Sequence, residues 1–283
     1  MKFTKMHGIG NDYIYFNCMD SNIENPNELS VKLSQYHFGV GADGIVLIMP
    51  SDSADFRMRM FNADGSEGKM CGNATRCIGK YVYDRGLTDK TEITLETLSG
   101  IKYLKLDVSD GKVSSVSVDM GEVDFTAENI PVISDKKELV SEEVFINGEK
   151  VKVTCVSVGN PHCVIFTENI DGLDLEKIGP VYENDKMFPE RVNTEFVEII
   201  DKSTLKMRVW ERGSGETWAC GTGACATVAA AVKNGICMPN TEVTVKLRGG
   251  DLNICCKSDG HIIMRGPAAF VFDGEILMEG VKC

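Results

Sequence analysis

The sequence lacks the features that mark membrane-spanning, secreted or zinc-binding proteins. No apolar run approaches the roughly 20 residues that a spanning helix needs, and residues 1–7 reach a Gly-Asn turn without the apolar segment of a signal peptide. The eleven cysteines are an odd number without a regular framework, and neither a C-x-x-C pair nor finger-like His spacing accompanies them. We therefore expect a reduced, cytoplasmic protein without structural disulfides or a metal site.

The sequence also has little positive charge. It carries 30 Lys and Arg against 42 Asp and Glu, a formal net charge of −12, which disfavours nucleic acid and anionic membranes as partners. Hydrophobic residues make up 43% of the chain, and no low-complexity tract interrupts it. A chain of 283 residues with this composition can bury a real core and is long enough for two domains of ordinary size.

One pattern occurs twice along the chain. Met58-Arg-Met-Phe-Asn62 resembles Met207-Arg-Val-Trp-Glu211, and each segment is followed by a Cys-Gly pair. The matched segments are 10–11 and 159–160, 58–62 and 207–211, 71–72 and 220–221, 91–95 and 241–245, and 109–111 and 258–260. The offset is 149 residues, or 150 for one pair, and such a constant offset indicates an internal duplication.

Each half combines many strands with one prominent helix. Alternating or β-branched segments predict strands at 56–61, 91–95, 101–108 and 113–118, and at 151–158, 162–166, 194–200, 205–210, 242–247, 252–256 and 261–265. The first helix is expected to begin near Gly72 and end at Gly86, and the second to begin near Gly221 and end at Gly235. Because the second helix is apolar on nearly every face, we expect strands to surround it. The predicted class is α+β: two pseudo-symmetric domains, each a mixed or antiparallel sheet wrapped around a central helix.

Two cysteines occupy equivalent positions directly before these helices. Cys71 and Cys220 each follow a polar, glycine-rich loop and precede a glycine. The N-terminus of a helix presents unpaired N–H groups and a partial positive charge, which favour a thiolate and can hold a carboxylate. Cys77 and Cys225 fall inside the helices and are predicted to be core residues.

Two thiols and two helix ends suit proton exchange at a carbon next to a carboxylate. One cysteine, as a thiolate, would remove the α-proton, and the other, as a thiol, would deliver a proton to the opposite face. The helix-end N–H groups would stabilise charge that develops on the carboxylate. The sequence therefore predicts an amino-acid epimerase with Cys71 and Cys220 as acid and base.

Several longer motifs identify a family. The segments at 8–13, 61–68, 70–73, 159–162, 191–195, 210–213 and 219–225 resemble, in order, those of diaminopimelate epimerase. The resemblance implies an isomerase that interconverts LL- and meso-diaminopimelate without PLP or another cofactor, in the route to lysine and a peptidoglycan precursor. It further implies a homodimer, an active site shared by the two domains, and a last segment that returns to the first domain. The expected domains are then 1–118 with 268–283, carrying Cys71, and 119–267, carrying Cys220.

The resemblance also assigns roles to residues by position. Cys71 and Cys220 match the acid/base thiols, and His162 and Glu211 match groups that tune the thiols and orient the substrate's amino group. The positions that match substrate-binding groups are Gly72, Asn73, Gly221 and Thr222 at the reacting carboxylate, and Asn62, Asn160, Asn193 and Arg212 at the distal end, with Asn11 close by. A guanidinium pairs with a carboxylate through two hydrogen bonds, which suits Arg212 to that role.

One position departs from the family pattern. Gly44 stands where many members have Gln, and at the 149-residue offset it aligns with Asn193. Position 44 can offer only backbone to a substrate, so we expect water or a neighbouring side chain to fill the space that the missing side chain leaves.

Other functions fit parts of the same pattern. A racemase or epimerase of the same fold could act on proline, hydroxyproline or a basic amino acid, although Arg212 and the asparagines favour a substrate that is polar at both ends. A thiol hydrolase or transferase would need one cysteine with a nearby His and would tolerate loss of Cys220. A non-catalytic binding protein would tolerate loss of both thiols.

Overall fold

The computed structural model describes residues 1–277, in which the chain forms two compact units. Unit 1 contains Met1–Val118 together with the chain from Gly266 onward, and unit 2 contains Asp119–Arg265. The last residues of the predicted returning segment, 278–283, and with them Cys283, lie outside the described residues.

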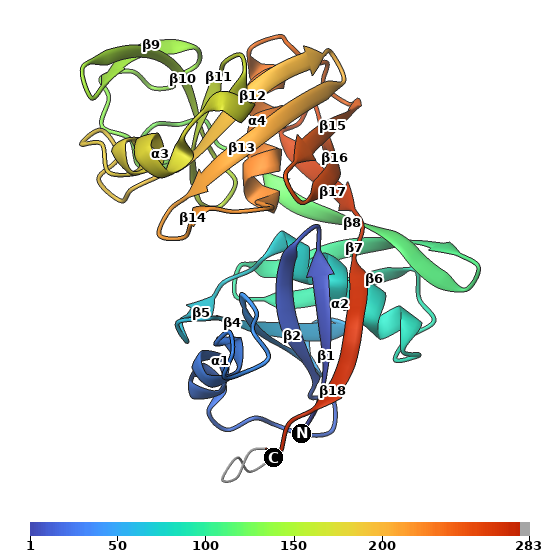
Figure 1. The fold of residues 1–283 in the computed structure, drawn as a ribbon. Coiled ribbons are helices and arrows are strands. Elements are labelled where there is room, and N and C mark those ends of the chain that lie inside the picture. The colour runs from blue at the N-terminus through green and yellow to red at the C-terminus, as the bar shows by residue number, and fades with distance from the viewer. Residues whose placement is uncertain (278–283) are drawn as a thin grey trace. The chain divides into compact units, whose positions relative to one another are not determined.

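Unit 1 is a mixed sheet with one central helix. Its elements are β1 (Lys2–Gly8), β2 (Asn11–Asn17), α1 (Pro26–Ser34), β3 (Gly44–Met49), β4 (Phe56–Asn62), β5 (Glu67–Gly68), α2 (Gly72–Asp84), β6 (Glu92–Thr97), β7 (Gly100–Ser109), the first part of β8 (Lys112–Glu122) and β18 (Ala269–Glu275). The strands pair in the order β18-β1-β2-β3-β4-β6-β7-β8, parallel at β2–β3 and β4–β6 and antiparallel elsewhere. In Figure 1 the late strand β18 lies beside the first strand β1, so the chain's end completes the sheet of its beginning. Helix α2 packs on β1, β2 and β7.

Unit 2 repeats this arrangement. Its elements are β9 (Glu142–Ile146), β10 (Glu149–Ser157), β11 (Pro161–Phe166), a short 3-10 helix (Ile170–Gly172), α3 (Leu175–Glu183), β12 (Asn193–Asp201), β13 (Thr204–Glu211), β14 (Gly215–Glu216), α4 (Gly221–Lys233), β15 (Glu242–Leu247), β16 (Gly250–Cys256) and β17 (His261–Gly266). Pairing runs β9-β10-β11-β12-β13-β15-β16-β17, parallel at β11–β12 and β13–β15. Helix α4 packs against β10, β11, β12, β13, β15 and β16, which confirms the predicted surrounded helix (Figure 1).

The register of the strands reproduces the duplication. Ile45 pairs with Phe61 between β3 and β4, and Thr194 pairs with Trp210 between β12 and β13, each 149 residues later. The two central helices begin and end at the same offset, and the glycines after them, Gly86 and Gly235, have positive φ values of 73° and 72°. Glycine adopts this left-handed conformation without steric cost, so both helices end where the sequence predicted.

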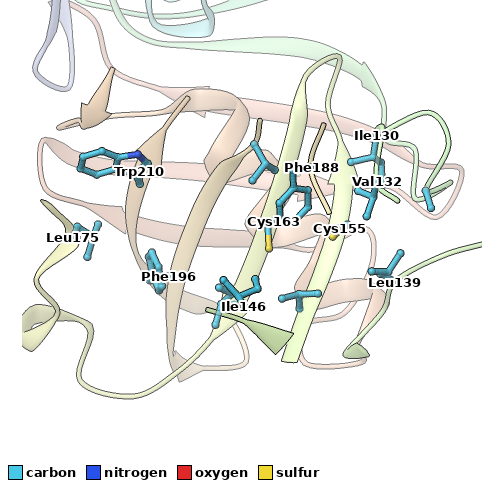
Figure 2. Close-up of a cluster of buried hydrophobic side chains, with 14 of the residues drawn as sticks. Ile130, Val132, Leu139, Ile146, Cys155, Cys163, Leu175, Phe188, Phe196 and Trp210 are labelled. Atoms are coloured by element: carbon cyan, nitrogen blue, oxygen red, sulfur yellow. The ribbon is translucent and has the colours of Figure 1, made fainter. Parts of the chain in front are cut away.

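A buried hydrophobic cluster supports the β10–β13 side of unit 2 (Figure 2). Cys155 and Cys163 are paired positions on the neighbouring strands β10 and β11, and both are fully buried in this cluster. Cys77 and Cys225 are likewise fully buried within α2 and α4. These four thiols therefore behave as small apolar core groups.

Two helices were not expected from the sequence. Helix α1 begins with Pro26 at its first turn and buries Leu29 and Leu33, whereas α3 is capped by Asp174 and contains Pro180. Both are nine residues long, too short to be stable alone, so tertiary packing rather than local periodicity decides that they form.

Candidate functional site

Cys71 ends the loop before α2 and is the residue that caps this helix. Its φ and ψ of −133° and 122° are extended, and its carbonyl accepts the first bond of the helix from Thr75 N at 2.9 Å. The side chain is half-buried, and its Sγ donates to Oδ1 of Asn11 at 3.4 Å. Asn11 in turn donates through Nδ2 to Oδ2 of Asp43 at 2.7 Å, so its amide is fixed with the oxygen toward the thiol.

Cys220 caps α4 in the same manner but is buried. Its Sγ accepts from the backbone N–H of Gly223 at 3.3 Å and lies 3.5 Å from the hydroxyl of Thr222. Burial raises the pKa of the Cys220 thiol well above its usual value, and the charges of Glu211 and Glu195 add to this effect. The sequence favoured a thiolate at this helix end, and the structure shows the opposite balance, because two carboxyl groups and burial outweigh the bonds from Thr222 and Gly223.

Glu211, the last residue of β13, is a carboxyl neighbour of Cys220. The thiol hydrogen-bonds to its carboxylate, and the hydroxyl of Thr217 donates to Oε1. Burial raises the pKa of Glu211, although these two bonds oppose the rise. A carboxyl group and a thiol in contact, both with raised pKa values, are typical of an acid/base site.

His162 and Asn160 connect to the same helix end. His162 lies on β11, and its imidazole is fully buried. Its Nδ1 lies 2.6 Å from Oε1 of Glu195, and its Nε2 lies 2.9 Å from Oδ1 of Asn160. Nδ2 of Asn160 donates to the Thr222 hydroxyl at 3.3 Å. Unit 2 thus joins Cys220, Thr222, Asn160, His162 and Glu195 in one polar network.

A salt bridge of the same geometry secures the loop before each cysteine. Arg59 Nε lies 2.7 Å from Oε1 of Glu67, and Arg208 Nε lies 2.8 Å from Oε1 of Glu216. In both pairs a second guanidinium nitrogen donates to the other carboxylate oxygen at 3.0 Å. These bidentate pairs tie the short strands β5 and β14 to β4 and β13 and thereby restrict the loops that lead to the thiols.

Of the predicted binding residues of unit 1, Asn62 has its own partner, whereas Gly72 and Asn73 share one. Asn62 ends β4 and donates to the hydroxyl of Ser66 at 3.0 Å. Asn73, in the first turn of α2, accepts at Oδ1 from the buried Arg76 at 2.7 Å. Gly72 opens the helix, and its carbonyl accepts from Arg76 at 3.4 Å. Gly72 and Asn73 therefore form the first turn of α2 directly after Cys71, and both are held by Arg76.

In unit 2, two of the residues predicted to bind the distal end of the substrate contact each other. Asn193 donates to the carbonyl of Pro161 and accepts from the backbone N–H of Arg212, both at 2.9 Å. The guanidinium of Arg212 donates to the carbonyl of Glu190 at 2.9 Å. Asn193 thus fixes the backbone of Arg212, while Gly221 and Thr222 form the first turn of α4 next to Cys220.

The neighbouring side chain expected at Gly44 is the ring of Tyr13, and the backbone of strand β4 also lies in this space. A Cβ atom at this position would lie 2.0 Å from the carbonyl oxygen of Phe61 and 2.9 Å from Cε1 of Tyr13. The space of a missing side chain is therefore already occupied by the neighbouring strand β4 and by the Tyr13 ring, so glycine is required by the close approach of the backbone.

Two buried groups beside the cysteines were missed by reasoning from the sequence. Glu195 ends the family motif 191–195, but the sequence around it predicts only an apolar strand. Arg76 lies within the first predicted helix, where an arginine normally faces solvent. Both side chains are fully buried. The only indication in the sequence was a charged residue at a position that the periodicity of the strand or helix predicts to be buried. Such a residue points to a partner, because Glu and Arg are rarely buried without one.

Within residues 1–277, no helix is long and apolar enough to cross a membrane. No cluster of three or more potential His, Cys, Asp or Glu metal ligands occurs in the same part of the chain.

Known proteins match the chain over nearly its whole length. The family model "Diaminopimelate epimerase" matches residues 3–126 and 154–271. The diaminopimelate epimerases of Acetivibrio thermocellus and Methanococcus maripaludis are 60% and 58% identical over 277 residues, which cover 98% of this chain and 98% and 99% of theirs. A hydroxyproline epimerase structure from Agrobacterium vitis, 13% identical, superimposes with a TM-score of 0.71 over 97% of this chain and 91% of that one. The last likeness shows the fold alone, and it agrees with the predicted class.

Proposed function

The chain belongs to the diaminopimelate epimerase family, and we propose from this premise that it interconverts LL- and meso-diaminopimelate without PLP or another cofactor. The observation that carries the proposal is the 60% identity to a diaminopimelate epimerase over 98% of both chains. The reaction would serve the route to lysine and to a peptidoglycan precursor.

In the proposed mechanism Cys71 and Cys220 exchange protons with the same α-carbon. The thiolate of one removes the α-proton, and the thiol of the other protonates the opposite face. The geometry that supports this assignment is the same in both halves: each cysteine is the N-terminal cap of the central helix, where backbone N–H groups favour an anion. Gly72, Asn73, Gly221 and Thr222 would stabilise the carboxylate as the enolate-like state forms.

We assign the protonated thiol of the free protein to Cys220 and the role of the base to Cys71, which must first lose the proton that it donates to Oδ1 of Asn11. Burial and two neighbouring carboxyl groups raise the pKa of Cys220, whereas the position equivalent to Glu211 near Cys71 is the neutral Asn62. Glu211 and His162 would tune Cys220 and orient the substrate's amino group. Asn11, Asn62, Asn160, Asn193 and Arg212 would bind the distal, non-reacting end.

A solvent-exchange experiment tests the proposed function. LL-diaminopimelate is incubated with the protein in D2O without PLP, and deuterium at the α-carbons is followed by mass spectrometry. We expect deuterium to enter at one α-carbon in the wild type, and Cys71→Ser and Cys220→Ser each to lose turnover severely. Cys255→Ser is the matched control, because it makes the same change at a half-buried strand cysteine.

The outcome also separates the alternatives. Near-normal turnover in either single mutant would contradict the two-thiol mechanism, and a dispensable Cys220 alone would indicate a hydrolase or transferase. Exchange with proline or 4-hydroxyproline but not with diaminopimelate would assign a different substrate.

The assembly and location are part of the same proposal. We expect a cytoplasmic homodimer, as in the family, and light scattering of the purified protein measures its mass directly. A mass equal to that of one chain, 31.0 kDa, would contradict the homodimer without affecting the proposed chemistry.

A further inference from the structure

Glu195 is a fully buried carboxyl group to which the family motifs give no role. It lies on β12, and its Oε1 is 2.6 Å from Nδ1 of the fully buried His162. Its Oε2 has no hydrogen-bond partner among the described residues. A half-satisfied buried carboxyl is costly, so its presence calls for a reason beyond folding.

The duplicated half shows that the fold does not require this carboxyl group. Tyr15 pairs with Val46 between β2 and β3, and Val164 pairs with Glu195 between β11 and β12. Val46 therefore occupies the equivalent position in unit 1, where it is also fully buried. The strand therefore forms with an apolar residue at this position in unit 1. The carboxyl group is present only in unit 2, which also carries His162.

The hydrogen bonds of His162 fix the number of protons that the pair holds. Nε2 lies 2.9 Å from Oδ1 of Asn160, an atom that can only accept, so Nε2 must carry a proton. One further proton must lie between Nδ1 and Oε1 of Glu195, on either atom. The pair therefore holds two protons and has no net charge, whichever atom the shared proton occupies.

This protonation state gives direction to a chain of hydrogen bonds. His162 donates to Oδ1 of Asn160, so Nδ2 of Asn160 is free to donate to Oγ1 of Thr222 at 3.3 Å. The hydroxyl proton of Thr222 can then point to Sγ of Cys220 at 3.5 Å. A donor in this place stabilises a thiolate at Cys220.

We propose that Glu195 is a positioning residue: the proton that it shares with His162 sets the direction of the hydrogen-bond chain that ends at the sulfur of Cys220. The inference rests on the proposed function, in which Cys220 loses a proton to the substrate and regains one. If the pair releases the shared proton to solvent, the His162 Nε2 becomes an acceptor, the Asn160 amide turns, and Thr222 donates to Asn160 instead of Cys220.

Other titratable groups also face Glu195. Besides His162, these are Cys163 on β11, Glu211 on β13 and Cys220 at the start of α4. The carboxyl group of Glu195 lies close to the first turn of α4. A Cβ atom on Gly223 would lie 2.9 Å from Oε1 of Glu195 and 3.2 Å from Sγ of Cys220. Glu195 is therefore near enough for its charge and its proton to affect the thiol.

Kinetics of an amide variant test the proton exchange. Glu195→Gln keeps the shape and can hydrogen-bond to His162, but an amide cannot take up or release the shared proton. We expect kcat to fall at least about tenfold with KM changed less than about threefold, and the pH profile of kcat to lose a limb. Glu198→Gln, the same change further along β12, is the matched control. A Glu195→Gln protein with the kcat and pH profile of Glu198→Gln would overturn the proposal.

A spectroscopic measurement tests the pair without reference to activity. The chain has four His residues, so ¹⁵N-histidine labelling gives few signals, and His162→Gln identifies that of His162. We expect a protonated Nε2 and a far-downfield proton shared by Nδ1 and Glu195, lost in Glu195→Val, which copies Val46. An unprotonated Nε2 in the wild type would overturn the proposal. Absence of epimerisation in the wild type would instead refute the proposed function. The spectrum would still test whether His162 and Glu195 share a proton.

Discussion

Replacement of Gly44 by alanine adds one methyl group where two strands touch. The new Cβ atom would lie 2.0 Å from the carbonyl oxygen of Phe61 and 3.0 Å from Cα of Asn62, whereas ordinary contacts begin at 3.4 Å. Both atoms belong to the backbone of β4, so no side-chain rotation relieves the clash. Strands β3 and β4 must separate at the Gly44–Asn62 pair.

The loss of stability in Gly44→Ala can be estimated from the strand separation that the clash requires. Overpacking of a well-packed interior typically costs about 1–3 kcal/mol, and a clash with backbone belongs at the upper end. Loss of about one ladder hydrogen bond adds about 1 kcal/mol. We therefore expect Gly44→Ala to lower the free energy of unfolding of unit 1 by about 3–4 kcal/mol, a large share of the roughly 5–15 kcal/mol that stabilises a domain. The displaced Asn62 should also weaken substrate binding.

Urea unfolding can assign the loss to one unit. Both tryptophans, Trp210 and Trp218, belong to unit 2, so their fluorescence reports on unit 2 while far-UV circular dichroism reports on the whole chain. Gly44→Ala should shift the dichroism transition to lower urea and leave the fluorescence midpoint closer to the wild type. Gly172→Ala is the control, because the nearest neighbours of its Cβ belong to the rotatable side chain of Asn169, with Nδ2 at 3.1 Å. A Gly44→Ala protein as stable as the Gly172→Ala protein would refute the reasoning.

Three further predictions concern other parts of the chain. In Gly179→Ala the new Cβ would lie 2.2 Å from the Trp210 ring, so we expect a red-shifted emission and about 3 kcal/mol less stability in urea. Glu211→Gln removes a charge that raises the pKa of Cys220, so the pH midpoint of Cys220 alkylation, followed by mass spectrometry, should fall; an unchanged midpoint would contradict this. Burial raises the pKa of Cys77 from 9.0 to about 12, so its stabilising contribution is complete below pH 9 and lost as the pH rises through 12. Cys77→Ala should therefore flatten the alkaline loss of stability over that range, and an unchanged slope would show that Cys77 does not cause it.

Sequence periodicity predicted the elements whose own residues decide their form. Helices α2 and α4 begin at Gly72 and Gly221, as expected, because a glycine-rich loop precedes each and an apolar stripe follows. The mixed sheet was predicted from alternation and from the absence of βαβ spacing. The duplication was the strongest signal, since its 149-residue offset recurs in the strand register of both units.

The electrostatic state of Cys220 could not be read from the sequence. The helix end alone favours a thiolate, but Glu195 and Glu211 come from two other strands, and their distance from the thiol depends on packing. The same limit applies to Gly44: its departure from the family pattern is visible in sequence, but the approach of Phe61 that requires it is visible only in three dimensions.

The two halves provide an internal comparison that separates what the fold needs from what the chemistry needs. The frame is the same in both: a helix capped by cysteine and a bidentate Arg–Glu pair on the preceding loop. Among the positions that differ between the halves, Tyr13, Gly44, Val46 and Asn62 correspond to His162, Asn193, Glu195 and Glu211.

These exchanges place the titratable groups in unit 2 and leave the equivalent positions of unit 1 without a carboxyl group or an imidazole. A two-base reaction requires that two chemically identical thiols differ in protonation when the substrate arrives. In a duplicated frame the two helix dipoles contribute alike, and the backbone N–H of Gly223 bonds to Sγ of Cys220 and so favours a thiolate there. The raised pKa of Cys220 therefore comes from its burial and from the carboxyl groups of Glu211 and Glu195. Replacing Glu211 and Glu195 together by their unit 1 counterparts, Asn and Val, should therefore bring the alkylation midpoint of Cys220 toward that of Cys71. If the two midpoints stay as far apart as in the wild type, the asymmetry has another source.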